Sequence, residues 1–564
     1  MREIVESVVI AFVLAFLFRT FEAEAFVIPT GSMAPTLMGR HKDLKCEACG
    51  YSYRVSASAE VDKESSRPTG VQITSATCPV CRYTMNVGRN NPRGENYRSY
   101  KGDRILVGKF PYQFSDPERW DVAVFKYPGE ARTNYIKRVV GLPGETLRIR
   151  HGNIFVERDG QPETIARKPL DKIRAMLQPV HDNDYVLPQV AEGHWPARWT
   201  PRAAGPSQPG DWVASEDFKS FRVAGSADRE VWLSYQHRVP SYADWQKWLA
   251  GQWSSQDDIK PQLITDFNAY NTSDPSSGGG WPGSYWPSSM AEGAESDSLR
   301  PGQPPPGETL GLNWVGDLAL ECEVAVEEAT GTVTFELVEG GKRLGCLIDL
   351  ATGKGSFRID GEEQSTFSTP MSAAGEYELL LANIDDQLTL DIDGQTTVFA
   401  YEPQGNLRPT ADDLEPVRIA SRGAKLSVRH LKVGRDIYYI ALRAGDGHEP
   451  RVTEYDASNS PFRTESREEV ARVLSSPEEW GGFARGNEVE FKLGPDQFFM
   501  LGDNSAASQD SRWWEALNAE YYVSRELLIG KALVIYWPHS LDQIPGTPIP
   551  IRFFPNFWRM GLVR

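Results

Sequence analysis

The chain has 564 residues, of which 40% are hydrophobic and 24% charged, and its formal net charge is -17. This length predicts two to four domains, the composition is typical of a folded globular protein, and the acidic balance argues against a general nucleic-acid-binding protein. Six cysteines are too few to form a disulfide scaffold in so long a chain.

An apolar segment stands at the start of the chain. Residues 8–18 are uninterrupted apolar, with acidic and basic residues before them and an arginine after them. A membrane helix needs about 20 mostly apolar residues, and a tilted segment over residues 4–21 approaches that length. A cleavable signal peptide is the alternative, because residues 23–25 (AEA) match the small-x-small pattern. One positive charge on each flank leaves the orientation undetermined.

A short stretch after this segment, residues 29–37 (PTGSMAPTL), contains Ser32, whose hydroxyl is a candidate nucleophile. Gly31 permits close approach of the backbone next to Ser32, and Pro35 prevents the continuation of a helix. We therefore expect Ser32 on an exposed turn. Taken alone, such a serine is more often a structural turn residue than a nucleophile.

Two cysteine pairs follow at the spacing of metal ligands: Cys46 with Cys49, and Cys78 with Cys81. Two such turns complete a tetrahedral zinc site of the zinc-ribbon type, and four thiolates leave no open position for a catalytic water. We expect a structural zinc in an insertion over residues 41–95. The alternative is a pair of disulfides if this segment lies outside the cytoplasm, where thiols oxidise.

Strand-like patterning returns at residues 102–107 and 121–128, and the next element carries Lys137. A lysine in a strand is usually a solvated charge. Here the flanking sequence, Tyr-Ile before Lys137 and Val-Val at positions 139–140, predicts a buried amine. Burial lowers the pKa of a lysine because it disfavours the charged form.

The region between residue 158 and residue 502 is too long to be a loop. Residues 271–307 are dense in Pro, Gly and Ser, and the following sequence alternates apolar and polar residues to about Tyr439. Asp-Gly pairs at 360–361 and 393–394 are typical of hairpin turns. We therefore expect a β-sandwich of lectin-like or laminin-G-like outline. Cys322 and Cys346 are expected to be buried small apolar residues or one disulfide. Such a sandwich could bind glycan or merely pack, and no cluster of residues decides between the two.

A third stretch, residues 502–512 (GDNSAASQDSR), follows the apolar residues 498–501. By itself it predicts a turn after a strand. Together with residues 29–37 and 135–144 (YIKRVVGLPG), in this order behind an apolar segment, it resembles type I signal peptidases. The resemblance covers a minority of the chain, and the cysteine insertion departs from the usual family pattern.

The resemblance implies a Ser/Lys dyad, in which Lys137 is the base for the Ser32 nucleophile and no cofactor takes part in catalysis. The Thr30 hydroxyl and the Ser32 amide would stabilise the oxyanion, and Ser508 would orient the Lys137 amine. Four further residues would form supporting ion pairs: Arg138, Asp503, Asp510 and Arg512.

The same resemblance implies a single-pass protein of the cell (inner) membrane, with the anchor at residues 1–22 retained and the catalytic domain on the extracytoplasmic side. Its substrates would be exported preproteins with small residues at the first and third positions before the cut, bound in extended form. Membrane lipid would contact the aromatic residues of 553–560, and nucleic acid would not be a partner.

The expected fold is mainly β, with a catalytic β-domain in two parts, residues 23–158 and 441–564, interrupted by the sandwich region 159–440. Three alternatives remain at this point. One is an envelope-anchored binding protein that uses the sandwich for glycan or protein ligands. The others are a zinc-ribbon protein that binds nucleic acid and a self-cleaving Ser-Lys repressor protease, which would need a DNA-binding domain that the sequence does not indicate.

Overall fold

We analysed a computed structural model of the chain, which describes residues 23–62, 65–202, 211–226, 229–272, 311–402, 407–443, 453–455, 458–464, 466–544 and 549–564. The expected anchor over residues 1–22 and nearly all of the Pro-, Gly- and Ser-rich tract lie outside these residues. Among the helices of the described ranges, none has the length and apolar character needed to cross a membrane. The fold is mainly β, as the sequence predicts.

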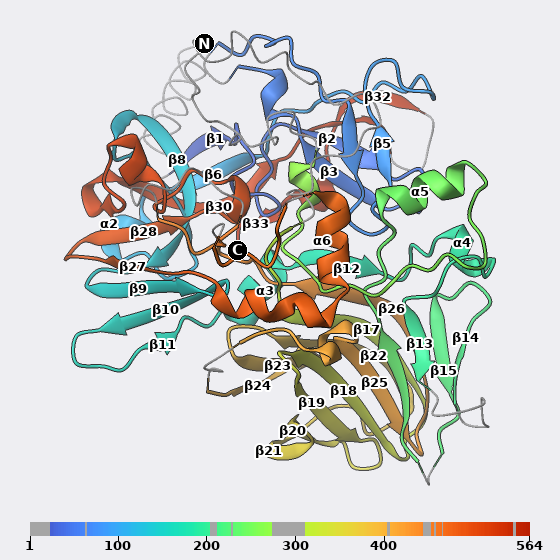
Figure 1. Cartoon of the computed structure of the whole chain (residues 1–564). Helices are drawn as coiled ribbons and strands as arrows, with labels where there is room; N and C mark the ends of the chain where they lie inside the picture. Colours follow the sequence, from blue (N-terminus) through green and yellow to red (C-terminus); the bar gives the residue numbers. More distant parts are fainter. Residues whose placement is uncertain are drawn as a thin grey trace, which may run out of the picture.

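One antiparallel sheet combines strands from the two ends of the described chain (Figure 1). Its order is β1-β6-β30-β7-β8-β28-β29, and β33 pairs with β30. We call it the catalytic sheet. Its strands are β1 (Ala23–Val27), β6 (Arg104–Gly108), β7 (Val122–Tyr127), β8 (Glu130–Gly141), β28 (Gln497–Leu501), β29 (Val523–Ser524), β30 (Leu528–Trp537) and β33 (Gly561–Leu562).

The register of this sheet brings two of the sequence motifs together. Lys137 in β8 lies opposite Ala123 in β7, and Leu501 at the end of β28 lies opposite Arg138. The chain between β8 and β28 is long, so that this pairing is a long-range one. A smaller sheet beside it has the order β11-β10-β9-β27, formed by β9 (Glu145–Arg150), β10 (Asn153–Arg158), β11 (Thr164–Ile165) and β27 (Glu488–Lys492).

The cysteine region consists of two hairpins, each with a CxxC turn at its tip. The first joins β2 (His41–Lys45) to β3 (Ser52–Ser56), and the second joins β4 (Ser75–Thr77) to β5 (Thr84–Asn86). Apolar side chains from both hairpins share a core cluster with residues of the later segment 187–269. The hairpins are therefore packed against the region that follows β11, not only against each other.

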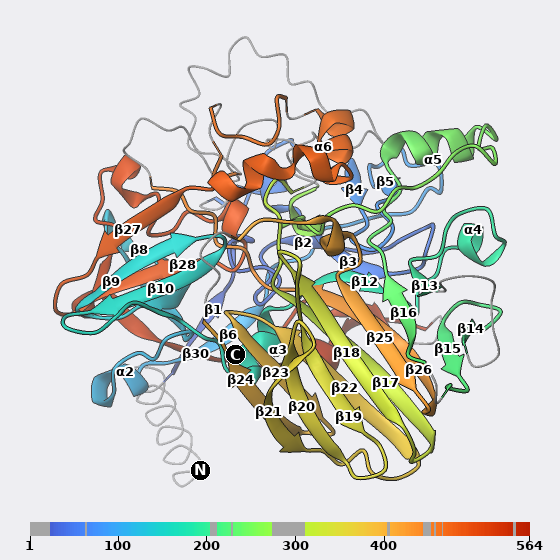
Figure 2. The ribbon, with the colours of Figure 1, turned by 60° about the horizontal axis from the view of Figure 1, so that its bottom comes forward.

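The lower part of the molecule in Figure 1 contains two sheets that pack on one core. One has the order β14-β15-β26-β17-β22-β23-β24, with β12 pairing β26, and the other layer contains β13-β16-β25 and β18-β19-β20-β21. Figure 2 shows these strands running side by side. Their bounds are β12 (Gln178–Asp182), β13 (Trp199–Arg202), β14 (Trp212–Ala214), β15 (Ser220–Val223), β16 (Val231–Tyr235), β17 (Leu318–Glu328), β18 (Thr332–Glu339), β19 (Lys342–Asp349), β20 (Lys354–Ile359), β21 (Glu362–Ser368), β22 (Gly375–Asn383), β23 (Gln387–Ile392), β24 (Gln395–Ala400), β25 (Val417–Arg422) and β26 (Lys425–Arg435).

The alternation of the sequence explains this two-sheet body. Leu320, Val324 and their alternate neighbours in β17 are buried, whereas the residues between them are partly exposed. The Asp-Gly turns at 360–361 and 393–394 have positive φ at both residues, as hairpin turns of this type require. Cys322 and Cys346 are free thiols in the core, so they act as small apolar residues and not as a disulfide.

Helices are short and lie at the surface or between the sheets. The α-helices are α2 (Pro111–Phe114), α3 (Leu170–Met176), α4 (Pro188–Ala191), α5 (Tyr242–Leu249) and α6 (Arg467–Leu474). The 3-10 turns are η1 (Ser58–Glu60), η2 (Ala269–Asn271), η4 (Ala411–Leu414), η5 (Pro477–Arg485), η6 (Ser505–Ala507), η7 (Trp514–Leu517), η8 (Arg525–Leu527) and η9 (Phe557–Arg559), and a last hairpin joins β31 (Leu541–Gln543) to β32 (Pro550–Phe554).

Candidate active site

Ser32 lies in the turn that joins β1 to β2. The backbone folds back on itself there, since Ala34 N donates to Gly31 O over 3.0 Å. The expectation of an exposed turn is wrong, because only 9% of the Ser32 surface is accessible. Segments distant in sequence cover it: a Cβ atom on Gly502 would lie 2.4 Å from the carbonyl oxygen of Ser32. Local sequence contains no sign of that contact.

Lys137 reaches Ser32 from the middle of the catalytic sheet. Its Nζ donates a 2.7 Å hydrogen bond to Ser32 Oγ, and only 4% of its surface is accessible. The Tyr135 ring, with its centroid 5.5 Å from Nζ, lies on the same side of the strand. The predicted burial of this amine is therefore observed. An amine at this distance from a hydroxyl has the geometry to remove its proton once the amine itself is neutral.

Arg138 points to the opposite face of β8 and forms a bidentate ion pair. Its Nε and Nη2 donate to the two carboxylate oxygens of Asp503 at 2.7 and 2.6 Å, and both side chains are fully buried. Burial disfavours the cation, but the Asp503 carboxylate more than offsets this, so that the pKa of Arg138 is raised. Thr36 Oγ1 donates to the same carboxylate over 2.5 Å. This pair thus connects β8, the segment after β28 and the turn that carries Ser32.

A second buried ion pair closes the stretch 502–512. Arg512 donates through Nε and Nη2 to Asp510 at 2.9 and 2.8 Å, and its Nη1 donates to Ser505 Oγ at 3.0 Å. Asp510 also accepts from Gly502 N over 3.1 Å. The structure therefore brings the four expected charged residues together as two ion pairs. Each pair fixes a loop beside Ser32.

Within the described part of the chain, the structure does not show the contacts that were expected for the hydroxyls of Ser508 and Thr30. Ser508 is fully buried beside Gly502, but its Oγ has no hydrogen-bond partner among the described residues, so the expected bond to Lys137 is not formed here. Thr30 is half-buried, two residues before Ser32. The roles of Ser508 as an orienting hydroxyl and of Thr30 at the oxyanion stay predictions.

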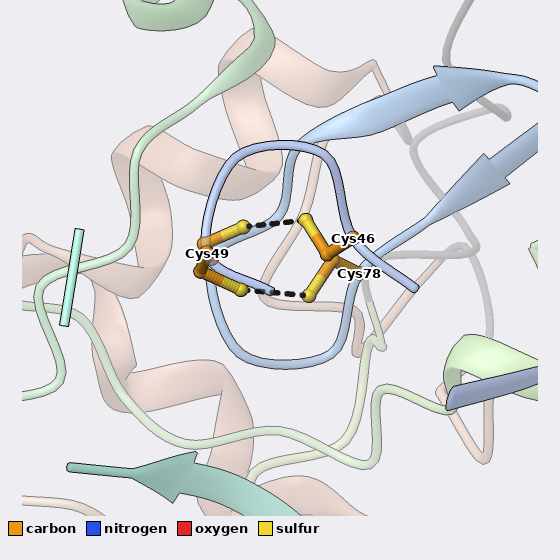
Figure 3. A group of neighbouring side chains, drawn as sticks. Cys46, Cys49 and Cys78 are labelled. Carbon is orange, nitrogen blue, oxygen red and sulfur yellow. Dashed lines mark hydrogen bonds between the residues drawn. The ribbon is translucent and has the colours of Figure 1, made fainter. Parts of the chain in front are cut away.

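The four cysteines of the two hairpins converge on one point (Figure 3). Cys46 Sγ lies 3.5 Å from Cys81 Sγ, and Cys49 Sγ lies 3.7 Å from Cys78 Sγ. All four sulfur atoms lie within 4.8 Å of one another. Disulfide sulfurs are separated by about 2.05 Å. Four sulfurs around a zinc ion at about 2.3 Å are separated by about 3.8 Å, which the observed distances approach.

The two CxxC turns have the same backbone geometry. Gly50 N donates to Cys46 O over 2.9 Å, and Arg82 N donates to Cys78 O over 3.0 Å. Gly50 and Arg82, each directly after the second cysteine, both have positive φ, at 81° and 58°. Glycine adopts this conformation without strain, which is why its position after Cys49 is informative in the sequence. The equivalent turn at Arg82 has no such signal.

Two residues beside Ser32 were not foreseen from the sequence. Asn504 belongs to a stretch that was singled out, but its contact with the Ser32 turn was not foreseen. Tyr270 lies in the long region between the motifs, and a Cβ atom on Gly31 would be 2.1 Å from its ring. No local pattern in the sequence marks Tyr270.

Comparison with known proteins confirms the resemblance to type I signal peptidases. A family model described as signal peptidase, peptidase S26, matches residues 89–195 and 418–537, which include Lys137 and Ser508 but not Ser32. Signal peptidase I of Pseudomonas aeruginosa is 52% identical over 131 residues, which is 17% of this chain and 44% of the relative. Signal peptidase I of Pseudomonas fluorescens is 49% identical over 117 residues, covering 17% and 41%. The chain therefore spans less than half the length of these relatives.

Among solved structures, a Caenorhabditis elegans galectin, LEC-6, is similar to 21% of this chain and 83% of its own, at 13% identity and a TM-score of 0.17. So low a score carries no argument about ligands.

Proposed function

We propose that this chain, which is similar to type I signal peptidases, is a membrane-anchored serine endopeptidase that removes signal peptides from exported preproteins. The observation that carries the proposal is the 2.7 Å hydrogen bond from the buried Lys137 amine to Ser32 Oγ. A hydroxyl is a weak nucleophile until a base takes its proton, and a desolvated lysine can be that base. The similarity to named signal peptidases supports the substrate class.

In the proposed mechanism, neutral Lys137 takes the proton of Ser32 Oγ while Oγ attacks the scissile carbonyl. The amide of Ser32 and the hydroxyl of Thr30 stabilise the oxyanion that forms. Lys137 then gives its proton to the leaving amine as the C–N bond breaks, and an ester to Ser32 remains. Neutral Lys137 next takes a proton from the water that attacks the ester, and it gives this proton to Ser32 Oγ as the ester C–O bond breaks, which releases the acid and regenerates Ser32 and neutral Lys137. The Arg138–Asp503 and Asp510–Arg512 pairs keep the surrounding loops in place.

The test of this function uses full-length protein in detergent and a preprotein with small residues before its cleavage site. Ser32→Ala and Lys137→Ala should each abolish the shortened product, since nucleophile and base act as a unit. Lys137→Arg should be equally inactive, because a guanidinium does not give up its proton at usable pH. Lys126→Ala, on the exposed face of the neighbouring strand, is the matched control and should cleave normally. Full cleavage by Ser32→Ala would favour the alternative of an envelope-anchored binding protein.

We also propose that residues 1–22 form a retained anchor and that the C-terminal aromatic residues rest on the same membrane. Phe557 and Trp558 are 62% and 72% exposed, as side chains at a membrane–water interface would be. The mature protein should begin at or next to Met1 and stay in the membrane fraction after a carbonate wash. An N-terminus at Phe26 would instead establish a cleaved signal peptide.

The four cysteines are proposed to hold one structural zinc ion, with the two CxxC turns forming a zinc-ribbon-like insertion at 41–95. Four thiolates are the donor set that structural zinc prefers, and they leave no position for a catalytic water. Purified protein should contain about one zinc per chain, even when no zinc is added during preparation. Absence of zinc, together with no titratable thiol among these four in denatured protein, would contradict the proposal and favour disulfides.

We also propose a division of the chain into two bodies. The catalytic body comprises 23–158 and 441–564, and the region 159–440 is a β-sandwich inserted within it. The two sheets that share one core between β12 and β26 support this division.

A further inference from the structure

We propose that residues 268–272, in the region between the second and third motifs, position the Ser32 nucleophile and connect it mechanically to the four-cysteine site. The catalytic part of this proposal rests on the proposed peptidase function. Residues 268–272 lie outside both spans that match the signal peptidase family model. The contacts are therefore made by a part of this chain that the family match does not cover.

The first contact is the packing of Tyr270 on the Ser32 turn. Tyr270 is 4% exposed and forms a buried apolar cluster with Ala34 and Met38. Its ring lies so close to Gly31 that an added Cβ would come within 2.1 Å of it, and its hydroxyl donates to Arg40 O over 3.2 Å. The ring thus fills the inside of the turn over residues 31–40. Removing it would leave a cavity directly beside the nucleophile.

The second contact is an amide network centred on Asn504. Asn504 Nδ2 donates to Gly31 O over 3.1 Å, and Asn504 N donates to Ser32 O over 3.1 Å. Asn271 binds the Asn504 side chain reciprocally, donating to its Oδ1 over 2.8 Å and accepting from its Nδ2 over 2.7 Å. Asn268 adds a 3.2 Å bond to the same Oδ1. Every hydrogen-bonding site of the Asn504 amide is used, which fixes its orientation.

The third contact joins the same segment to the cysteine site. Thr272 Oγ1 accepts from Thr77 N over 3.0 Å and donates to Ala269 O over 2.8 Å, and Thr272 is fully buried. Thr77 directly precedes Cys78. The guanidinium of Arg82, just after the second CxxC pair, stacks on the Phe267 ring at 3.3 Å from its centroid. Both ends of the second CxxC turn therefore rest on residues 267–272.

The second and third contacts form one continuous path from Cys78 to Ser32. It runs through Thr77, Thr272, Asn271 and Asn504, and every step is a covalent neighbour or a hydrogen bond. Loss of order at the cysteine site would remove the support of Thr272, and the amide network would then hold the Ser32 turn less tightly. The inference is that an intact cysteine site keeps Ser32 within reach of Lys137.

Amide hydrogen exchange of the full chain tests the connection without reference to activity. Chelation of the bound metal, or Cys78→Ser, should speed exchange in the peptide 29–40 by about 10-fold or more, with peptides of β17–β22 as the internal reference. Thr272→Val should speed exchange in this peptide by a similar factor. In the Thr272→Val variant, disruption of the cysteine site should increase exchange little further, because the two changes interrupt the same path. Thr272→Ser keeps the hydroxyl and should restore wild-type exchange. Unchanged exchange in 29–40 after loss of the cysteine site would overturn the connection.

Kinetics on a preprotein test the positioning role. Asn271→Ala should lower kcat by about 10- to 100-fold while KM changes by less than about 3-fold, because a misplacement of about 1 Å costs rate more than binding. Asn459→Ala removes an amide that bonds the Arg485 carbonyl, outside this network, and should leave kcat unchanged. Tyr270→Phe keeps the packing and should lose less activity than Tyr270→Ala. Wild-type kcat in Asn271→Ala would overturn the positioning role.

The two sets of results separate this inference from the proposed function. If wild-type protein cleaves no preprotein but peptide 29–40 loosens when the cysteine site is disrupted, the peptidase function fails and the mechanical connection stands. If cleavage depends on Ser32 and Lys137 but neither exchange nor kcat responds to Asn271 or Thr272, the function stands and this inference fails.

Discussion

Lys137 and Lys168 are two of the almost fully buried lysines among the described residues, and they differ in the groups to which they donate. Lys137, 4% exposed, donates to the hydroxyl of Ser32 over 2.7 Å. Lys168, 3% exposed, donates to both carboxylate oxygens of Asp385 at 2.8 and 2.9 Å and to Asp436 at 2.8 Å. A hydroxyl partner is neutral, whereas the two carboxylates are charged.

The partners decide what each amine can do. Burial disfavours the ammonium form of Lys168, but Asp385 and Asp436 more than offset this, and the pKa of Lys168 is raised above its usual value. It is a permanent cation at physiological pH and cannot act as a base. Burial alone therefore does not identify a catalytic lysine. The group that the amine faces must also be considered.

Lys168 instead has a structural position. It lies between β11 and α3, where the chain enters the two-sheet body, and Asp436 lies directly after β26, where the chain leaves it. Asp385 is in the hairpin between β22 and β23 of the same body, and the Trp120 ring centroid is 4.6 Å from Nζ. One ammonium thus connects the entry, the exit and an inner hairpin of the two-sheet body.

The largest effect is expected from replacing Lys137 with methionine, which keeps most of the side-chain volume and removes the amine. We expect Lys137→Met to lower kcat/KM for a preprotein by about 10³-fold or more, because the proposed base is lost. Its melting temperature should stay close to that of the wild type. A comparison of cleavage rate and thermal unfolding on the same sample checks this. A large loss of stability in Lys137→Met would contradict this comparison, because it would show that Lys137 also stabilises the fold.

The matched change at the other site, Lys168→Met, should show the reverse. Removing the cation leaves Asp385 and Asp436 buried side by side without it, and breaking a buried ion pair in this way typically costs about 3–5 kcal/mol. The protein that remains folded at low temperature should still cleave preprotein. Denaturant unfolding and cleavage at 10 °C measure the two properties. Normal stability with abolished cleavage would contradict a purely structural role for Lys168.

The dyad was predicted from motifs and not from local physical patterns. Ser32 and Lys137 are 105 positions apart, and neither spacing nor periodicity places one beside the other. Their association followed from the order of three stretches that resemble a family. The buried ion pairs of Arg138 and Arg512 were expected for the same reason. Which carboxylate pairs with which arginine depends on the register of β8 with β28, and only the structure contains that information.

The β class was predictable from alternation where the strands are long, as in β17 and β18. The strands β12 to β16, which precede the Pro-, Gly- and Ser-rich tract, have three to five residues each, too few for alternation to identify them, yet β12 and β15 pair with β26. The burial of Ser32 was also missed. It depends on Tyr270 and Asn504, whose contacts with the turn arise from tertiary packing that no local sequence window contains.

Glu454 extends the comparison of the two lysines to a buried acid with neutral partners. Its carboxylate accepts from Tyr438 Oη over 3.1 Å and from Ala441 N over 3.3 Å. Burial raises the pKa of Glu454 to about 8, with these hydrogen bonds opposing the rise and Asp266 adding to it. Both of these hydrogen-bond donors are neutral, so neither contributes a positive charge that would hold Glu454 in its charged form.

The smallest expected effect is therefore a dependence of stability on pH that is specific to Glu454. Its pKa in the folded protein lies above the unfolded value of about 4.5, so the folded state keeps a proton that the unfolded state has lost. The stability that this provides is complete below about pH 4.5 and is lost as pH rises through about 8. Glu454→Gln should then gain stability relative to the wild type between pH 5 and pH 8, by up to about 1.4 kcal/mol per pH unit. Thermal unfolding of both proteins across this range measures the difference, with Glu520→Gln at an exposed position as the control. A difference that does not change with pH would show that Glu454 is ionised in the folded protein, and that neutral hydrogen-bond donors alone are enough to stabilise a buried charge in this fold.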